Sequence, residues 1–173
     1  MVREQLKGKN IVITGASGGI GAEIAKLCAE SGANLVLLAR SVDKLEQLQI
    51  YLEEHHHRRV NVFKLDVSDT DQVKEVFEQI FEQIGHIDIL VNNAGITRDK
   101  TFRKLNEEDW RKVIDVNLNS VFNTTNAVIP GMLEQKYGRI INISSIIGQA
   151  GGFGRPLRPL RRNRRDWRAD VCL

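Results

Sequence analysis

Three closely spaced glycines near the amino end are the first residues whose type and spacing could support chemistry. Gly15, Gly19 and Gly21 follow a β-prone apolar run at 9–14 and precede a helical pattern at 22–31. A strand, a glycine-rich turn and a helix in this order are typical of a dinucleotide-binding fingerprint. Glycines let the backbone approach a pyrophosphate, and the helix N-terminus offers it unpaired N–H groups. The residues that this pattern assigns to a cofactor are Gly15, Ser17, Gly19, Ile20 and Gly21.

Two alternatives to a dinucleotide site are a glycine turn without a ligand and an NTPase phosphate loop. The second is disfavoured, because no Lys-Ser or Lys-Thr pair follows Gly21.

Three later segments carry small or polar residues where a strand or helix would present them. The apolar run 87–91 leads into Asn92-Asn93-Ala94-Gly95, and the run near 139–144 ends in Ser144-Ser145. Asp115-Val116-Asn117-Leu118 lies inside a long helical pattern. With the T-G-x-x-x-G-x-G spacing of the glycine turn, these motifs resemble, in type and order, those of the short-chain dehydrogenase/reductase family. The resemblance covers about residues 5–154.

The resemblance implies hydride transfer between a nicotinamide cofactor and a carbonyl or alcohol carbon. In the family a Tyr exchanges the proton, a Lys lowers the pKa of that Tyr, a Ser holds the substrate oxygen and an Asn supports a proton-relay water. A cation is needed because an unperturbed phenol has a pKa of about 10. By position, Asn117 and Ser145 match the family's catalytic Asn and Ser, with Ser144 as an alternative, while Asn93, Ala94 and Gly95 line the cofactor site.

The family's Tyr and Lys have no counterpart in this sequence. The Tyr position, thirteen residues after Ser145, is Arg158, and the Lys position is Arg162. Within these 173 residues no Tyr follows Tyr137 and no Lys follows Lys136. Arginine stays protonated near neutral pH and cannot replace the phenol. We therefore expect impaired turnover in the chain as written.

The end of the second predicted strand bears on the choice of cofactor. NAD enzymes of this architecture place a carboxylate there on the adenosine ribose, but here Arg40 follows the strand and could pair with the 2′-phosphate of NADP. NADP(H) is favoured over NAD(H), although the nearby Asp43 keeps NAD open. Asp66-Val67 resembles the family's adenine-contacting pair, and a helix cap is the alternative role for Asp66.

The substrate class is suggested by the segments that follow these motifs. Residues 93–99 and 146–154 resemble those of 3-oxoacyl-thioester reductases, including acetoacetyl-CoA reductases. The resemblance implies reduction of a β-keto group carried on acyl carrier protein or CoA. Arg98, Arg103 and Lys104 could meet an acidic carrier or CoA phosphates, or could form a solvated charged loop.

The elements that must position these residues alternate along the chain. Strands are predicted near 9–14, 34–39, 60–65, 87–91 and 139–144, and helices near 19–31, 42–56, 69–84 and 107–136. This order predicts an α/β, Rossmann-like, doubly wound parallel sheet with helices on both faces, incomplete at the carboxyl-terminal end. Expected helix caps are Ser41, Ser68 and Asn106.

Charge divides the chain into two parts. Residues 155–173 contain seven Arg and two Asp, so they contribute +5 to the net charge of +3 and leave −2 for residues 1–154. We expect residues 1–154 to form the dinucleotide-binding domain and residues 155–173 to be a disordered Arg-rich tail outside the family pattern. No nucleic-acid partner is expected for the domain, but a basic tail that binds nucleic acid is an alternative function.

The tail's composition also suggests a shifted reading frame. A two-base deletion near codon 155 would restore a Tyr codon at residue 158, although the Lys is not recovered. We expect an incomplete domain to expose apolar faces and to associate, whereas full-length family members form homo-oligomers.

The remaining sequence signals are negative. No apolar run is long enough to span a bilayer, and no signal peptide is evident, so a cytoplasmic location is expected. Cys28 and Cys172 do not indicate a disulfide framework. No metal site is expected, since the adjacent His55-His56-His57 would point in different directions from the end of a helix.

Overall fold

A five-stranded parallel sheet forms the centre of the protein. The computed structural model describes residues 5–98 and 104–145. The strands lie in the order β3-β2-β1-β4-β5, and every pair is parallel. Their bounds are β1 (Asn10–Thr14), β2 (Asn34–Ala39), β3 (Val60–Lys64), β4 (Ile89–Asn92) and β5 (Arg139–Asn142). The Rossmann-like doubly wound fold predicted from the alternating pattern is confirmed.

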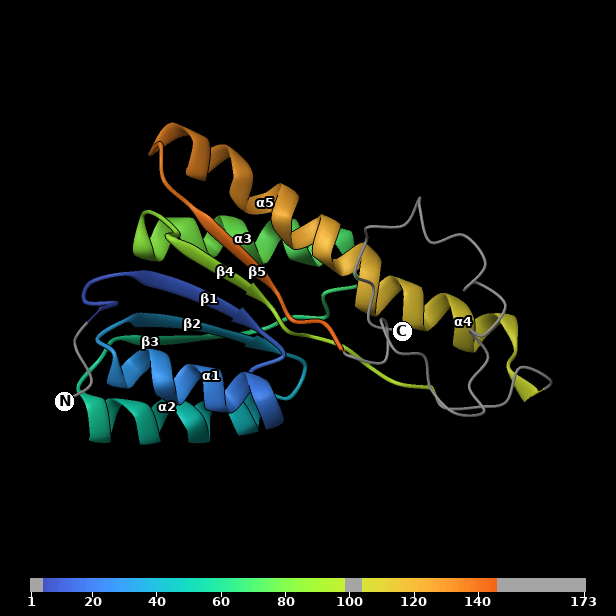
Figure 1. The fold of residues 1–173 in the computed structure, drawn as a ribbon, viewed down its shortest axis with the longest axis horizontal. Helices are drawn as coiled ribbons and strands as arrows, with labels where there is room; N and C mark the ends of the chain where they lie inside the picture. Colours follow the sequence, from blue (N-terminus) through green and yellow to red (C-terminus); the bar gives the residue numbers. More distant parts are fainter. Residues whose placement is uncertain (1–4, 99–103, 146–173) are drawn as a thin grey trace.

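Helices cover both faces of the sheet, as Figure 1 shows. Helices α1 and α2 lie on one face and α3 and α5 on the other. The helix bounds are α1 (Gly19–Glu30), α2 (Val42–His56), α3 (Thr70–Ile84), α4 (Glu107–Ile114) and α5 (Ser120–Glu134). Among the described residues, no helix combines the length and apolar character needed to cross a membrane.

Two hydrophobic clusters, one on each side of the sheet, make up the core. Alternate strand residues point to opposite faces, so Ile11 and Ile13 join the cluster beneath α1 and α2, whereas Val12 joins the cluster beneath α3 and α5. Strands β1 and β4 are fully buried, whereas all four residues of β5 are exposed. The near-continuous apolar runs of the inner strands follow from burial on both faces.

The long helix predicted for residues 107–136 is not continuous. A π-helical segment, η2 (Asp115–Asn119), separates α4 from α5. A π turn inserts one extra residue into the helical repeat and changes which side chains face the sheet. The apolar periodicity alone did not reveal this interruption.

The helix caps differ in part from those expected. Asn106 caps α4 as predicted, accepting a hydrogen bond from the Asp109 amide at 2.7 Å. Asp69, not Ser68, caps α3, and Ser41 makes no side-chain capping bond at the start of α2. A carboxylate one residue closer to the helix accepts from two amides, and this geometry displaces Ser68 from the role.

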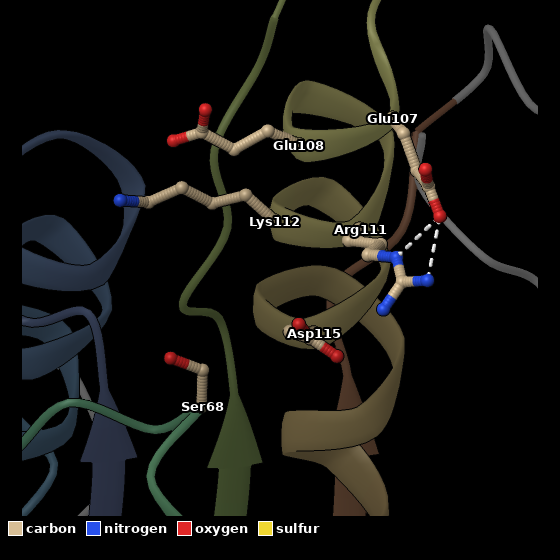
Figure 2. Close-up of a pocket in the computed structure, with 6 residues that line it drawn as sticks. All are labelled: Ser68, Glu107, Glu108, Arg111, Lys112 and Asp115. Atoms are coloured by element: carbon tan, nitrogen blue, oxygen red, sulfur yellow. Dashed lines mark hydrogen bonds and ion pairs between the residues drawn. The ribbon is translucent and has the colours of Figure 1, made fainter.

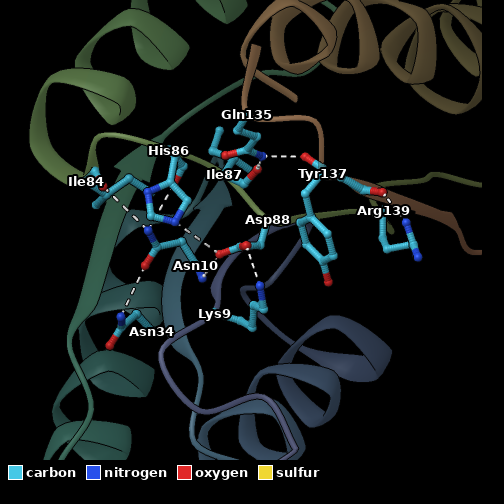
Figure 3. A network of polar contacts seen from close by, with 11 residues as sticks. Lys9, Asn10, Asn34, Ile84, His86, Ile87, Asp88, Gln135, Tyr137 and Arg139 are labelled. Carbon is cyan, nitrogen blue, oxygen red and sulfur yellow. Dashed lines mark hydrogen bonds and ion pairs between the residues drawn. The ribbon is translucent and has the colours of Figure 1, made fainter. Parts of the chain in front are cut away.

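A polar network fixes the amino ends of the central strands (Figure 3). The buried carboxylate of Asp88 accepts hydrogen bonds from Lys9 Nζ at 2.8 Å and from the Asn10 amide at 2.9 Å. His86 Nε2 lies 3.4 Å from the same carboxylate. These contacts join the start of β1 to the start of β4.

Candidate cofactor and active site

The predicted site residues gather where the strands end. The first crossovers run from β1 outward to β2 and β3, and the later ones run to β4 and β5 on the other side, so the strand order reverses between β1 and β4. In open parallel sheets a ligand-binding crevice lies at such a reversal, beyond the carboxyl ends of the strands. The glycine turn follows β1 at this position, and Asn93-Ala94-Gly95 follows β4.

The glycine turn has the geometry that an anion site needs. Gly15 and Gly19 have φ values of 66° and 54°, which favour glycine. A Cβ on Gly18 or Gly19 would meet no atom within 4 Å, so the backbone there is open. Helix α1 begins without a side-chain cap or an acidic residue in its first turn. Among the described residues no side chain caps its first N–H groups, and the turn therefore fits a dinucleotide pyrophosphate.

Two glycines are required by close packing against the segment that follows β4. A Cβ on Gly15 would lie 2.8 Å from Ala94 Cα, and one on Gly21 would lie 2.5 Å from Asn93 Nδ2. Ser17 is half-buried and Ile20 is exposed on the same turn. All eight residues assigned to the cofactor on β1, α1 and β4 thus lie in one region of the structure.

Thr14 joins the glycine turn to the end of β4. Its buried hydroxyl accepts hydrogen bonds from the Asn93 and Ala94 amides, each at 3.0 Å. Asn93 Nδ2 in turn donates to the Thr14 and Gly15 carbonyls at 3.0 and 3.2 Å. These bonds satisfy backbone groups at the ends of both strands, and they hold the glycine turn against the segment that follows β4.

A second polar joint links β4, β5 and α5. Asn92 Nδ2 donates to Asn142 Oδ1 at 2.9 Å, and Asn92 Oδ1 accepts from the Thr124 hydroxyl at 2.7 Å. Asn92 and Thr124 are both buried. Their bonds fix β5, and thereby the segment that carries Ser145, relative to the cofactor side of the crevice.

Asn117 lies in the π-helical segment and contacts the chain just beyond Gly95. Its Oδ1 accepts from the Ile96 amide at 2.8 Å, and its Nδ2 donates to the Ile96 carbonyl at 2.9 Å. Both ends of the carboxamide are therefore engaged with backbone. This geometry makes Asn117 a residue that positions the segment after β4, next to the predicted cofactor site.

Ser144 and Ser145 follow β5, with Ser144 exposed and Ser145 half-buried. Residues 146–173 lie outside the described part of the chain. They include Arg158, Arg162 and the Arg-rich tail, so the structure does not test the predictions for these residues.

Arg40, Asp66 and Val67 are the residues predicted to contact the adenosine part of the cofactor. Arg40 is exposed directly after β2, and Val67 is buried after β3. Asp66 Oδ1 accepts from the Ser68 hydroxyl at 2.6 Å and from the Ser68 amide at 3.1 Å. Asp66 is not the cap of α3, so the alternative role considered for it is wrong.

The charge of Asp66 is stabilised by its surroundings. Burial alone would raise the pKa of this carboxyl, but the two hydrogen bonds from Ser68 and the positive charges of Arg40 and Lys112 hold the pKa below its ordinary value. An ionised Asp66 can accept a hydrogen bond from an amino group such as that of adenine.

The basic residues expected to meet a carrier are only partly described. Arg98 Nε lies 3.7 Å from Asp109 Oδ1, and Lys104 is exposed before α4. Arg103 lies outside the described residues. Arg98 is therefore engaged with α4, whereas Lys104 forms part of the surface.

The comparison that decides the family is a match over most of the chain. Residues 9–157 match the family model described as short chain dehydrogenase. The chain belongs to this family. The resemblance inferred from the four motifs is confirmed.

Relatives of known name are similar over the same region. The chain is 44% identical over 150 residues to the 3-oxoacyl-(acyl-carrier-protein) reductase FabG of Thermotoga maritima, covering 87% of this chain and 61% of that protein. It is 46% identical over 149 residues to the acetoacetyl-CoA reductase of Allochromatium vinosum, covering 83% and 58%. The chain thus spans about three fifths of the length of these relatives.

Two solved structures of oxidoreductases are also similar to this chain. The L-sorbose reductase of Gluconobacter frateurii, in complex with NADPH and L-sorbose, aligns with a TM-score of 0.84 and 34% identity over 88% of this chain and 58% of that one. An alcohol dehydrogenase of Thermococcus sibiricus in complex with 5-hydroxy-NADP aligns with a TM-score of 0.79 and 35% identity, covering 83% and 61%.

Two threonines that hydrogen-bond next to the predicted site were not assigned a role from the sequence. Thr14 precedes the first glycine and was used only as part of the strand and of the glycine motif, although its hydroxyl joins the glycine turn to the segment after β4. Thr124 lies inside the helical pattern predicted near 107–136, which gave it no particular role. A small hydroxyl residue at the end of a fully buried strand is a signal that could have identified Thr14.

Proposed function

We propose that this chain is the cofactor-binding part of an NADPH-dependent reductase of 3-oxoacyl thioesters, with impaired turnover in the form written here. The observation that carries the proposal is the joint of Thr14 and Asn93, which holds the open glycine turn against the end of β4. The similarity to FabG and acetoacetyl-CoA reductase supports the substrate class.

Different residues bind different parts of the cofactor. The glycine turn and the first N–H groups of α1 bind the pyrophosphate, and Asp66 with Val67 binds adenine. Arg40, an always-charged group on the surface after β2, favours NADP(H) over NAD(H) by attracting the 2′-phosphate. When bound, the nicotinamide supplies the hydride.

At the other end of the crevice, Ser145 orients the keto oxygen of the substrate and Asn117 holds the backbone at Ile96 in place. The proton for the reduced oxygen requires an acid that this sequence does not provide at residue 158. We therefore expect cofactor binding without turnover at a normal rate.

A second function, NADP(H) binding without catalysis, is favoured by the same departure from the family pattern. It predicts the same cofactor site and no reductase activity under any condition. Both proposals assign cofactor binding to the domain of residues 1–154, because all the predicted cofactor residues precede residue 154.

The deciding experiment follows oxidation of NADPH by acetoacetyl-CoA. The chain as written is compared with a version continued in the shifted reading frame with the family's Tyr and Lys restored. Activity only in the restored version supports the reductase proposal. Activity in the chain as written contradicts the assignment of the proton donor, and absence of activity in both, with NADPH still bound, supports the non-catalytic function.

The cofactor preference needs a separate measurement. The dissociation constants of NADPH and NADH are compared for the chain as written and for Arg40→Gln. We expect the substitution to weaken binding of NADPH more than binding of NADH. Equal binding of the two cofactors by the unsubstituted chain contradicts the preference.

A further inference from the structure

Two pockets in the surface of the described residues differ in chemical character. One, of about 540 Å³, lies between α4 and the loop after β3, and Figure 2 shows its lining. Three carboxylates line it against two cations, and one of these cations, Arg111, is paired with Glu107. This pocket therefore has no net positive charge for an anion. The other pocket, of about 640 Å³, lies between the carboxyl end of α5 and strand β5, and its apolar lining residues are Ile129, Met132, Leu133 and Ile140.

Strand β5 is an edge strand with outward-facing backbone groups. It pairs with β4 alone among the described strands. The amides of Arg139 and Ile143 donate to carbonyl groups on the β4 side at 3.0 and 2.9 Å. Backbone groups of successive residues in a strand point to opposite sides, so the N–H and C=O groups of Ile140 and Asn142 face the open edge. These two residues can pair with another strand.

The two edges of the sheet differ in how far their side chains are covered. At the β3 edge, four of the five side chains are buried or half-buried. All four residues of β5 are exposed, and Ile140 and Ile141 are 36% and 46% exposed. A strand that pairs with β5 would cover apolar side chains as well as the open backbone groups. The β5 edge is therefore the one that gains more from a partner.

Within these 173 residues, the sequence after β5 contains no second strand pattern for this edge. A parallel neighbour requires a crossover of a dozen or more residues, so it would begin at about residue 155 or later. Residues 155–173 contain seven Arg and two Pro and no run of four apolar residues. A second copy of the chain, in contrast, brings an edge strand of the same kind.

We propose that β5 of one copy pairs with β5 of a second copy in antiparallel orientation, about a two-fold axis at Ile141. This register uses both outward-facing residues, because Ile140 exchanges hydrogen bonds with Asn142 of the partner subunit, and Asn142 does so with the partner's Ile140. Ile141 then lies opposite the partner's Ile141 as a non-hydrogen-bonded pair. The two-fold axis closes the assembly at two copies.

The proposed register also separates the positive charges at the start of the strand. Arg139 lies opposite Ile143 of the partner subunit, so the two Arg139 side chains are four residues, or roughly 14 Å, apart along the strands. This separation exceeds the screening length of about 8 Å at physiological ionic strength. The pairing therefore brings apolar side chains together and places no like charges directly opposite each other.

The test is disulfide cross-linking across the proposed axis. Ile141→Cys is made in a chain whose own cysteines are replaced by Cys28→Ser and Cys172→Ser. Non-hydrogen-bonded partners in an antiparallel pair have Cα atoms about 4.5 Å apart, a distance that a disulfide spans. The matched control is Ile140→Cys in the same chain, because Ile140 and its copy would be diagonal neighbours about 7–8 Å apart, beyond the usual range. After mild oxidation we expect about 5-fold or more covalent dimer from Ile141→Cys than from Ile140→Cys.

Sedimentation equilibrium of the unsubstituted chain and of Ile140→Pro gives an independent measurement. Proline at residue 140 removes an N–H that faces the open edge and no N–H that bonds to β4. We expect the mass to fall from that of a dimer to that of a monomer, with the helical circular dichroism signal retained. If Ile140→Pro does not fold, the cross-linking comparison still decides.

Equal cross-linking of the two cysteine variants overturns the proposal, and so does an unsubstituted chain that is monomeric at every concentration. A dimer that persists in folded Ile140→Pro also overturns it. None of these measurements depends on NADPH, so their outcome is independent of the proposed function.

Discussion

At the scale of single residues, the cofactor turn approaches β4 closely because two side chains are missing. A Cβ on Gly21 would lie 2.5 Å from both Asn93 Nδ2 and the Gly15 carbonyl oxygen, and neither the amide nor the backbone can move without breaking the joint to Thr14. Gly18, in the same turn, has open space around its Cβ position and an extended φ of 169°. Neighbouring glycines in one motif therefore have different structural roles.

Gly21→Ala should destabilise the protein, whereas Gly18→Ala should not. We expect a loss of about 1–3 kcal/mol for Gly21→Ala, because the added methyl group must displace Asn93 or the turn. Gly18→Ala serves as the matched control and should change the free energy of unfolding by less than about 0.5 kcal/mol. Urea denaturation of both variants measures the difference, and equal stabilities contradict the packing argument.

Asp88 is a buried carboxylate that the fold keeps charged. Burial alone would raise its pKa, but hydrogen bonds from Lys9 and the Asn10 amide, with the positive charge of Lys9, hold its pKa below the ordinary value. The same contact raises the pKa of Lys9. A carboxyl with a lowered pKa in the folded state stabilises the fold above its unfolded pKa, and this contribution is lost as the pH falls through the folded pKa.

Asp88→Asn should reduce stability at neutral pH by about 1–3 kcal/mol, since a charge-assisted pair is removed from a buried site. The difference from the unsubstituted protein should shrink as the pH falls from the ordinary pKa of an aspartate toward the lower pKa of Asp88 in the folded state, because Asp88 itself then becomes protonated. Urea denaturation at several pH values measures this difference in the free energy of unfolding. Asp71→Asn, at an exposed carboxylate, is the control, and a difference that does not depend on pH would exclude the charge of Asp88 as its source.

At the scale of elements, the π-helical segment determines where Asn117 points. A single helix near 107–136 was predicted from the sequence. The interruption is stabilised by contacts that the local sequence does not contain, in particular the two bonds of Asn117 to Ile96, 21 residues earlier in the chain. π turns of this kind are frequent at functional sites.

Asn117→Ala tests whether the π-helical segment and the chain at Ile96 stabilise each other. Loss of the carboxamide leaves the Ile96 amide and carbonyl without these partners, and we expect the fold to lose about 1–3 kcal/mol. Amide hydrogen exchange at Ile96 should become faster. Asn119→Ala, which removes only an exposed bond to Asp115 at 2.8 Å, should have little effect on either quantity. Unchanged exchange at Ile96 would show that the segment is held by other contacts.

At the scale of the whole molecule, the parts of the fold predicted from sequence are those that local patterns determine. The alternating apolar strands and amphipathic helices predict the parallel sheet, and glycine chemistry predicts the turn after β1. The Thr14–Asn93 joint depends on the pairing of β1 with β4, which lie nearly 80 residues apart. Contacts of this kind follow from the tertiary arrangement and not from local spacing.

The surface around α5 and β5 carries the apolar side chains that were expected to cause association. Phe122 and Leu133 are 70% and 72% exposed, and Ile129 lies between them at 40%. Their spacing of seven and four residues places them on one face of α5. Beside this helix, β5 pairs only with β4 among the described strands, and Ile141 is 46% exposed. Exposed apolar patches next to an open sheet edge favour self-association.

We expect the chain to associate in a concentration-dependent way, and the pair Phe122→Gln and Leu133→Gln to shift it toward the monomer by reducing the apolar area of this face. Leu27→Gln is the matched control, because Leu27 is 62% exposed on α1, on the opposite side of the sheet. Sedimentation equilibrium over a range of concentrations gives the mass of each variant. If the unsubstituted chain is monomeric throughout, the face does not drive association, and if Leu27→Gln has an equal effect, association depends on total exposed apolar area and not on α5.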